Sequence, residues 1–328
     1  MVRPGIAWVV IGMLCSLACG SGSDGGSPQT ASSLPTPPPD SLASGTVLTV
    51  VSGEDDRPLA GVKAILAGRE YTSNDGGQVT LAESVRFGSL VDLTATGFLS
   101  RQTTLRSSGG TLFLLWPQMT ASGIDETFTA QVVYTESAAT EPASQGSAIL
   151  RRLSEGTTQA FVVLSQQILQ DDRAHQAHVA GVDAVNAWIG GCVRYVLAGA
   201  PVAGGVVFEA RVDGARVDCN SARATFFGRY NGRGEITGGE IVYCELETAR
   251  TGTVTHELGH SVGLQHSFVR REEVMAPFYS RSRSAVFSAR EGLVMSLLFE
   301  RRAGNRFPDS DRSVVGAAVV SHHPIICN

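Results

Sequence analysis

Three histidines and one glutamate stand at spacings that suit a catalytic metal ion. Residues 256–266 read His-Glu-Leu-Gly-His-Ser-Val-Gly-Leu-Gln-His, which is the pattern HExxHxxGxxH in full. A helix places residues four positions apart on one face, so the imidazoles of His256 and His260 can bind the same ion. Gly263 can adopt a left-handed backbone conformation that ends the helix, and His266 can then complete a set of three nitrogen ligands. Three protein ligands and one water are typical of catalytic zinc, whereas structural zinc sites have four protein ligands.

Glu257 directly follows the first of these histidines and is placed to act on a metal-bound water. Zinc lowers the pKa of such a water towards ~7, so a neighbouring carboxylate can take its proton. The activated water can attack a carbonyl carbon, and the glutamate can return the proton to the leaving amine. The sequence therefore predicts hydrolysis of an amide bond, with zinc as cofactor and Glu257 as general base.

The complete motif resembles that of the metzincin metalloproteases and, within them, the matrixins. This resemblance implies that His256, His260 and His266 bind one catalytic Zn²⁺, that Glu257 is the catalytic glutamate, and that an open cleft cleaves internal peptide bonds of proteins. It covers roughly residues 125–315, and about 25 residues around the motif carry most of it. The natural substrate, a calcium requirement and the oligomeric state stay open.

A second segment that resembles this family begins eight residues after the last histidine of the motif. Residues 274–279 read Val-Met-Ala-Pro-Phe-Tyr. By resemblance, Met275 lies beneath the zinc ligands as an apolar floor, the Met-turn, and Pro277, Phe278 and Tyr279 wall the pocket for the residue after the scissile bond. Astacin-like and serralysin-like enzymes carry a zinc-contacting tyrosine two residues after the methionine. Pro277 occupies that position here, so no such ligand is expected.

Two features that matrixins often have are not found in the sequence. No cysteine motif like PRCGxPD precedes the protease domain, so the mode of latency is open. A structural zinc site with an HxD-type cluster is also not recognised. The earlier histidines, His175 and His178, fall in a predicted helix and are expected to be packed or solvated, and His322 and His323 are expected on the surface.

Residues 151–320 show the alternation of strands and helices that is typical of an α/β domain. A helix is predicted from Asp171 or Asp172 to Ile189, with Ala174, His178, Val182, Val185 and Ile189 on one face. A capping box at Ser288 and Glu291 predicts a closing helix that ends near Gly304, with Leu293, Val294, Leu297 and Leu298 on one face. The expected metzincin-like fold is a twisted mixed sheet with these helices and the active-site helix. Substrate would extend along an edge strand, for which residues 224–227 are the candidate. Strands are predicted at residues 160–164, 193–197, 206–212, 224–227 and 240–246.

An all-β domain is predicted before the protease domain, at residues 44–117. Short apolar runs divided by turn signals such as Asn74-Asp75-Gly76-Gly77 predict a small sandwich. Residues 57–62, 72–76 and 95–98 resemble the carboxypeptidase regulatory-like domain, and they include no catalytic constellation, so a spacer or contact module is expected. Residues 118–150 are expected to form a linker, with one strand at 127–134. The predicted strands of the sandwich are residues 46–51, 62–66, 78–81, 90–95 and 111–116.

The N-terminal residues predict export. Arg3 precedes an apolar run at residues 6–17, which is too short to span a bilayer, for which ~20 residues are needed, and suits a signal peptide. Small residues before Cys19 resemble a bacterial lipoprotein signal, so residues 1–19 are the predicted signal and Cys19 the lipidated residue. Residues 20–43, rich in Gly, Ser and Pro, predict a tether from the membrane. Plain secretion is the alternative to a cell-envelope lipoprotein, and residues 321–328 form a tail.

Cysteines and charge limit the remaining possibilities. Beyond the signal stand Cys192, Cys219, Cys244 and Cys327, which in an exported chain predict two disulfides with three possible pairings. The net charge is −5, so nucleic acid is not an expected partner, and the near-zero mean hydropathy excludes a polytopic membrane protein.

Three functions compete: a zinc endopeptidase on protein or peptide substrates, a surface adhesion protein with an unused protease fold, and a zinc hydrolase for a non-peptide substrate. The intact Glu257 favours the first.

Overall fold

The computed structural model describes residues 40–106, 111–120, 124–134, 149–200, 202, 204–268, 270–277, 284–307, 309–311 and 324–327. The predicted signal peptide with Cys19, most of the tether, Phe278, Tyr279, His322 and His323 lie outside the described residues. Within the described residues, no helix is both long and apolar enough to cross a membrane.

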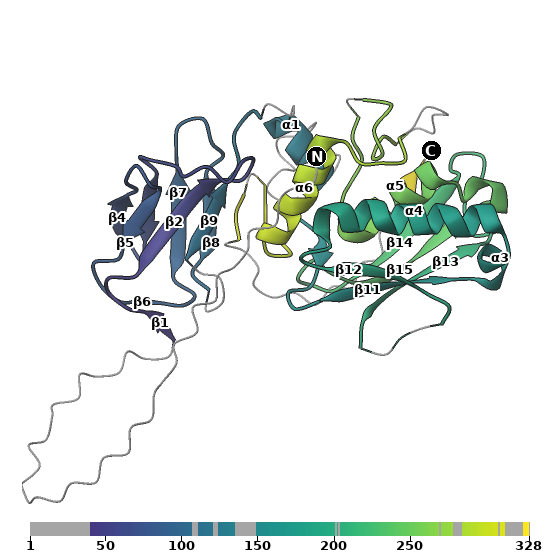
Figure 1. Ribbon diagram of the computed structural model, residues 1–328, viewed down its shortest axis with the longest axis horizontal. Helices are drawn as coiled ribbons and strands as arrows, with labels where there is room; N and C mark the ends of the chain where they lie inside the picture. The colour runs from purple at the N-terminus through teal and green to yellow at the C-terminus, as the bar shows by residue number, and fades with distance from the viewer. Residues whose placement is uncertain are drawn as a thin grey trace, which may run out of the picture. The chain divides into compact units, whose positions relative to one another are not determined.

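Residues 41–115 form a three-stranded, a four-stranded and a short two-stranded sheet, which share one apolar core (Figure 1). In β3 and β9 the buried positions alternate with more exposed ones, because successive side chains point to opposite faces. Five strands match the predicted runs, whereas β4 and β8 were not predicted because their sequences, Arg-Glu-Tyr-Thr and Arg-Gln-Thr-Thr, are mostly polar. The three-stranded sheet has the order β5-β2-β9 (Gln78–Thr80, Val47–Ser52, Leu112–Leu115), the four-stranded sheet has the order β4-β3-β7-β8 (Arg69–Thr72, Lys63–Leu66, Leu90–Thr94, Arg101–Thr104), and β1 (Ser41–Leu42) pairs with β6 (Val85–Arg86).

A mixed sheet organises the second half of the chain. Its strand order is β12-β11-β13-β15-β14-β16, with β10 also paired to β15. The strands from β12 to β15 in this order are parallel to one another, whereas β14 runs antiparallel to both β15 and β16. The sheet confirms the predicted α/β pattern. Its strands are β10 (Arg152–Leu153), β11 (Gln159–Leu164), β12 (Arg194–Ala198), β13 (Val206–Val212), β14 (Ala224–Tyr230), β15 (Glu235–Tyr243) and β16 (Pro324–Cys327).

Helix α4 (Asp172–Ile189) lies along one face of this sheet (Figure 1). The side chain of Asp171 caps it by accepting a hydrogen bond from the amide of Ala174 at 2.8 Å. All five residues of the predicted apolar face are buried, so the periodicity predicted this helix correctly. The shorter α3 (Gln166–Leu169) precedes α4, and the 3₁₀ turn η3 (Leu246–Thr248) precedes helix α5 (Thr251–Val262), which carries His256 and His260.

Helix α6 (Ala289–Glu300) begins at the predicted capping box. Ser288 accepts a hydrogen bond from the amide of Glu291, and the Glu291 carboxylate accepts one from the amide of Ser288. The four leucine and valine positions of its predicted face are buried. The helix ends at Glu300, four residues before the predicted end.

The predicted strand at residues 127–134 is wrong, because this segment is helical. It forms α1 (Glu126–Thr129) and one π-helical stretch, η1 (Ala130–Tyr134). The side chain of Asp125 accepts a hydrogen bond from the amide of Phe128 at 2.7 Å, which caps the first turn. Phe128 and Val132, four residues apart, are both buried in the core of the second half, although the sequence assigned them to a linker.

Buried polar contacts join β8 to the segment after α6. The guanidinium of Arg101 donates to the carbonyl oxygens of Leu114 and Glu300, both at 2.7 Å. The hydroxyl of Thr103 donates to the carboxylate of Asp311 at 2.7 Å, and Arg301 forms a bidentate pair with Asp309. These side chains are almost fully buried, so water does not compete for their hydrogen bonds.

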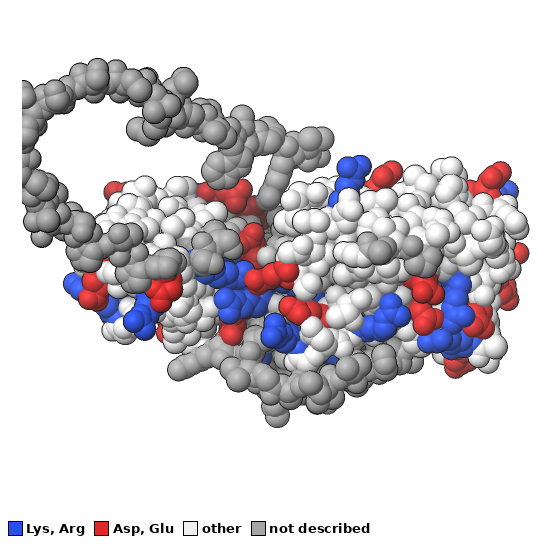
Figure 2. Space-filling model, turned by 90° about the horizontal axis from the view of Figure 1, so that it is seen from below, with Lys and Arg blue, Asp and Glu red and all other residues white. Residues whose placement is uncertain are grey.

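The surface carries charges of both signs. On the face shown in Figure 2, basic and acidic side chains are interspersed over the described residues, with no extended area of one sign.

Candidate metal centre

Three imidazoles converge at the end of helix α5. His256 and His260 lie one turn apart on this helix, and their Nε2 atoms are 3.1 Å apart. The ring of His266, in the loop after the helix, has its centroid 5.3 Å from that of His256 and 4.9 Å from that of His260. One nitrogen of each lies within 4.8 Å of the others, and among the described residues this is the one grouping of its kind. The three side chains are buried, and together they could hold a metal ion.

Backbone carbonyl groups fix the tautomers of two of these histidines. The Nδ1 atom of His256 lies at hydrogen-bond distance from the carbonyl oxygen of Val274, and that of His260 lies 2.7 Å from the carbonyl oxygen of Leu264. A carbonyl oxygen only accepts, so both Nδ1 atoms carry hydrogen and both Nε2 atoms keep a lone pair. The Nε2 atoms of His256 and His260 can therefore donate their lone pairs to a metal ion. In metal-binding histidines the second ring nitrogen likewise donates to a carbonyl or carboxylate oxygen.

Gly263 ends helix α5 in the way that the sequence predicted. Its φ angle is +123°, and a Cβ atom at this position would overlap the carbonyl oxygen of Arg151. Its amide donates to the carbonyl oxygen of His260 at 3.0 Å, and the next amide, of Leu264, donates to that of Gly259 at 3.1 Å. The chain turns here, and His266 comes back to the other two histidines.

Met275 packs directly against helix α5. It is fully buried, and its Sδ atom occupies the space that a side chain on Gly259 would need. The carbonyl oxygen of Met275 accepts a hydrogen bond from the amide of Ser267 at 2.7 Å, and its amide donates to Glu291 at 2.7 Å. The loop thus lies against the histidine helix and is tied both to the segment after His266 and to α6.

A buried ion pair supports the same loop and was not predicted. The carboxylate of Glu273 pairs with the guanidinium of Arg290 through two contacts of 2.5 and 2.6 Å. It also accepts hydrogen bonds from the hydroxyls of Ser267 and Ser288, at 2.9 and 3.2 Å. Arg290 lies over the ring of Phe128, 4.0 Å from its centroid. An acidic residue in a loop usually lies on the surface. Glu273 is buried because its charge is paired with that of Arg290, which is distant in the sequence.

Glu257 is fully buried on helix α5, beside the histidines. Burial raises the pKa of Tyr243 well above its ordinary value, and the negative charge of Glu257 adds a smaller effect in the same direction. The Nδ1 atom of His178 lies 2.7 Å from the carbonyl oxygen of Ala174 and therefore donates a hydrogen bond to it. The Nε2 atom then accepts a hydrogen bond from the hydroxyl of Tyr243 at 3.1 Å. Burial lowers the pKa of His178 to about 4. His178 is thus a packed, neutral histidine, as the sequence predicted.

The predicted substrate edge is the one expectation at the site that the structure changes. Strand β14 lies beside the histidines, since the ring of Phe226 stacks on that of His260 with centroids 6.4 Å apart. However, β14 is not a free edge, because β16 pairs with it in antiparallel register from Ala224 opposite Cys327 to Phe227 opposite Pro324.

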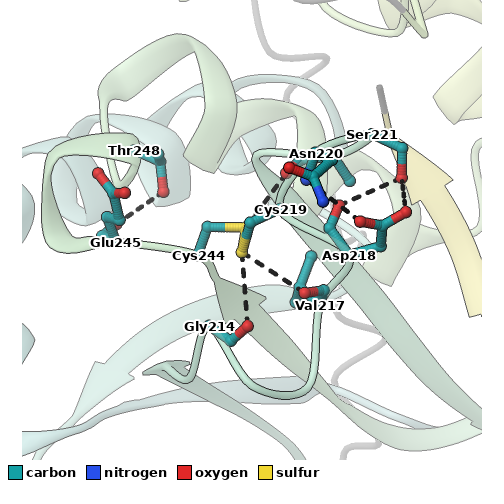
Figure 3. Close-up of a disulfide and its surroundings, with 10 residues drawn as sticks. Gly214, Val217, Asp218, Cys219, Asn220, Ser221, Cys244, Glu245 and Thr248 are labelled. Carbon is teal, nitrogen blue, oxygen red and sulfur yellow. Dashed lines mark hydrogen bonds between the residues drawn. A yellow bond between two sulfur atoms is a disulfide. The ribbon is translucent and has the colours of Figure 1, made fainter.

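One disulfide is present among the described residues. Cys219 and Cys244 are bonded, and the bond joins the loop before β14 to the end of β15 (Figure 3). The prediction that Cys192 also forms a disulfide is wrong, because its thiol is free and exposed. Cys192 precedes β12 at one edge of the sheet, whereas Cys327 belongs to β16 at the other edge, so the sheet separates them.

The predicted pocket wall is described only in part. Pro277 is buried next to the Met275 loop, and Phe278 and Tyr279 lie outside the described residues.

Residues 201–292 match the family model described as Matrixin. The matched region runs from the loop before β13 to the first turn of α6 and contains the three histidines, Glu257 and Met275. The match supports a matrixin-like metalloprotease domain, in a family whose members normally bind zinc. No curated protein sequence matches the chain.

Proposed function

We propose that this chain is a zinc-dependent endopeptidase that hydrolyses internal peptide bonds of proteins. The observation that carries the proposal is the convergence of three buried imidazoles next to Glu257, with His256 and His260 held in the metal-binding tautomer. His256, His260 and His266 would hold the ion, which leaves one position for water or a substrate carbonyl. The matrixin match over the same residues agrees with this assignment.

The chain's own groups divide the reaction between them. When bound, Zn²⁺ supplies Lewis-acid polarisation of a carbonyl and lowers the pKa of a coordinated water to ~7. The carboxylate of Glu257 would take a proton from the attacking water as its oxygen bonds to the carbonyl carbon, and would give that proton to the amine as the C–N bond breaks. The carbonyl oxygens of Val274 and Leu264 hold the two helical imidazoles in place throughout.

The residues that contact the substrate are assigned from the resemblance of residues 274–279 to the matrixin segment. By resemblance to matrixins, Met275 would be the apolar floor beneath the histidines, and Pro277, Phe278 and Tyr279 would wall the pocket for the residue after the scissile bond. The open cleft of matrixins favours cleavage within a chain over removal of terminal residues.

Cleavage profiling of the full chain tests this proposal. A mixed peptide library and a panel of folded proteins are incubated with the enzyme, with and without a chelator, and the products are identified by mass spectrometry. We expect internal cleavage that the chelator abolishes and added Zn²⁺ restores. Binding to the panel without any cleavage would favour the adhesion alternative, and chelator-sensitive turnover of non-peptide esters or amides alone would favour the third function.

We further propose that the mature protein is a bacterial cell-envelope lipoprotein anchored through Cys19. The lipid would hold the domains of residues 44–117 and 151–320 beyond the tether, and two acyl chains suffice for stable anchoring. The first of these domains is proposed to be carboxypeptidase regulatory-like. Wild-type protein should partition into detergent, whereas Cys19→Ala should be left uncleaved or be processed elsewhere. Soluble wild-type protein that begins at another residue would instead establish plain secretion.

A further inference from the structure

Strand β14 lies next to the histidine cluster. Phe226, in the middle of the strand, stacks on His260 with ring centroids 6.4 Å apart. The inner edge of β14 is paired to β15 along its length. A peptide that extends the sheet beside the histidines must therefore add to the outer edge, where its backbone can pair with that of residues 224–227.

The chain itself occupies this edge. Strand β16 (Pro324–Cys327) pairs antiparallel with β14, with Ile325 opposite Phe226 and Ile326 opposite Thr225. The four paired positions are the same four residues, Ala224–Phe227, that the sequence singled out for substrate. More than ninety positions separate the two strands in sequence, so this pairing is a tertiary contact and not a local hairpin.

We propose that residues 324–327 act as an intramolecular blocking strand, which competes with substrate for the outer edge of β14. This inference rests on the proposed function and adds its regulation. The backbone groups of the edge strand can form one set of ladder hydrogen bonds, so the blocking strand and an extended substrate exclude each other.

Attachment to the same chain makes this competitor effective. A segment of the same chain competes at an effective concentration that can reach the millimolar range, so even weak pairing can occupy the edge for most of the time. The apparent affinity for substrate then falls in proportion to the fraction of molecules whose edge is open. If the strand is paired in about nine molecules of ten, KM is about tenfold higher than in an open enzyme. The kcat value does not change, because an enzyme saturated with substrate has displaced the strand.

A double variant, Ile325→Pro with Ile326→Pro, tests the inference in the full chain. Proline has no N–H, and consecutive residues of a strand direct their N–H groups to opposite sides, so one of the two prolines removes a donor that faces β14. The matched control is Ile325→Val with Ile326→Val, which keeps both donors and a β-branched side chain. We expect the proline variant to show about a tenfold lower KM for a peptide identified by cleavage profiling, with the same kcat, and the valine variant to match wild type.

Hydrogen exchange gives a second readout that does not depend on peptidase activity. Backbone amides within residues 224–227 should exchange faster in the proline variant than in wild type and the valine variant, with equal metal content in all three. A synthetic peptide with the sequence of residues 321–328 should restore a high KM to the proline variant by competitive inhibition, whereas a scrambled peptide should not.

The two readouts separate failure of this inference from failure of the proposed function. If none of the proteins cleaves peptides, the proposed function is wrong, and hydrogen exchange still shows whether β16 covers β14. If exchange is equal in the three proteins, β16 does not protect this edge and the inference is overturned. Faster exchange with an unchanged KM would also overturn it, because substrate would then bind elsewhere.

Discussion

Glu273 and Arg290 form a bidentate ion pair, and only 3% of each side chain is exposed. The pair joins the start of the Met275 loop to the first turn of α6, and the same carboxylate accepts the hydroxyl of Ser267, the residue after His266. Glu291 takes part in a second link, because it accepts the amide of Met275 and also caps α6. The loop beneath the histidines is therefore held by the N-terminus of a helix that carries no metal ligand.

Loss of Glu273 should destabilise the whole protein. Glu273→Ala leaves the Arg290 guanidinium buried without its carboxylate, and breaking one side of a buried pair typically costs about 3–5 kcal/mol. Urea unfolding would measure the loss. Glu272 is exposed and adjacent, so Glu272→Ala is the matched control and should not change the free energy of unfolding measurably. An equal loss in the two variants would show that the ion pair has no special role.

Gly259 should not tolerate a side chain without adjustment of Met275. In Gly259→Ala the new Cβ would overlap Sδ of Met275 and approach Phe287 at 3.3 Å. Overpacking of this kind costs about 1–3 kcal/mol, against a gain of ~1 kcal/mol in helix propensity. We expect lower zinc affinity and a modest loss of stability, and Met275→Ala in the same chain should reduce both effects. The control is Gly199→Ala, at a glycine with no atom within 4 Å of the new Cβ, which should behave as wild type.

How much of this site the sequence predicts depends on how local its contacts are. The convergence of the histidines, the turn at Gly263 and the α6 capping box depend on contacts over a few residues, so the spacing of these residues predicted them, and the buried face of α4 followed from its period. The Glu273–Arg290 pair joins residues 17 positions apart across a loop, and no local pattern identifies Glu273 as buried. Apolar and polar residues alternate in residues 127–134, which suits a strand. The segment is helical instead, because a helix buries Phe128 and Val132, four positions apart, on the same side against the core. The pairing of β14 with β16 depends on chain topology, which composition does not specify.

Stability should fall in mildly acidic solution because of His178. Burial lowers its pKa from 6.5 to about 4 in the folded protein, so between these values the unfolded chain binds more protons. Above pH 6.5 the histidine is neutral in both states, and its full contribution to the free energy of unfolding is present. This contribution is about 3 kcal/mol, at ~1.4 kcal/mol per pKa unit, and it is lost as the pH falls towards 4. Unfolding free energies between pH 4 and 7 should depend less steeply on pH in His178→Gln than in wild type. Both proteins must be metal-free, so that release of metal at low pH does not contribute to the slope. Identical slopes would contradict a buried neutral His178.

Removal of the third imidazole should remove the metal. His266→Ala leaves two nitrogen ligands on helix α5, and two histidines hold zinc weakly. Metal analysis after dialysis should find little zinc in the variant, and activity should be lost with it. His175→Ala, a change to a histidine outside the cluster, is the matched control and should keep its zinc. Full zinc content in His266→Ala would show that another group completes the site.

The most direct measurement compares zinc content and peptide cleavage in wild type and Glu257→Ala. The Glu257 carboxylate is expected beside the metal ion and not among its ligands, so the variant should keep about one zinc per chain. Loss of the general base should lower kcat by about 10²- to 10⁴-fold. Unchanged turnover in the zinc-loaded variant would contradict the catalytic assignment of Glu257, and loss of zinc together with activity would show that Glu257 is itself a ligand.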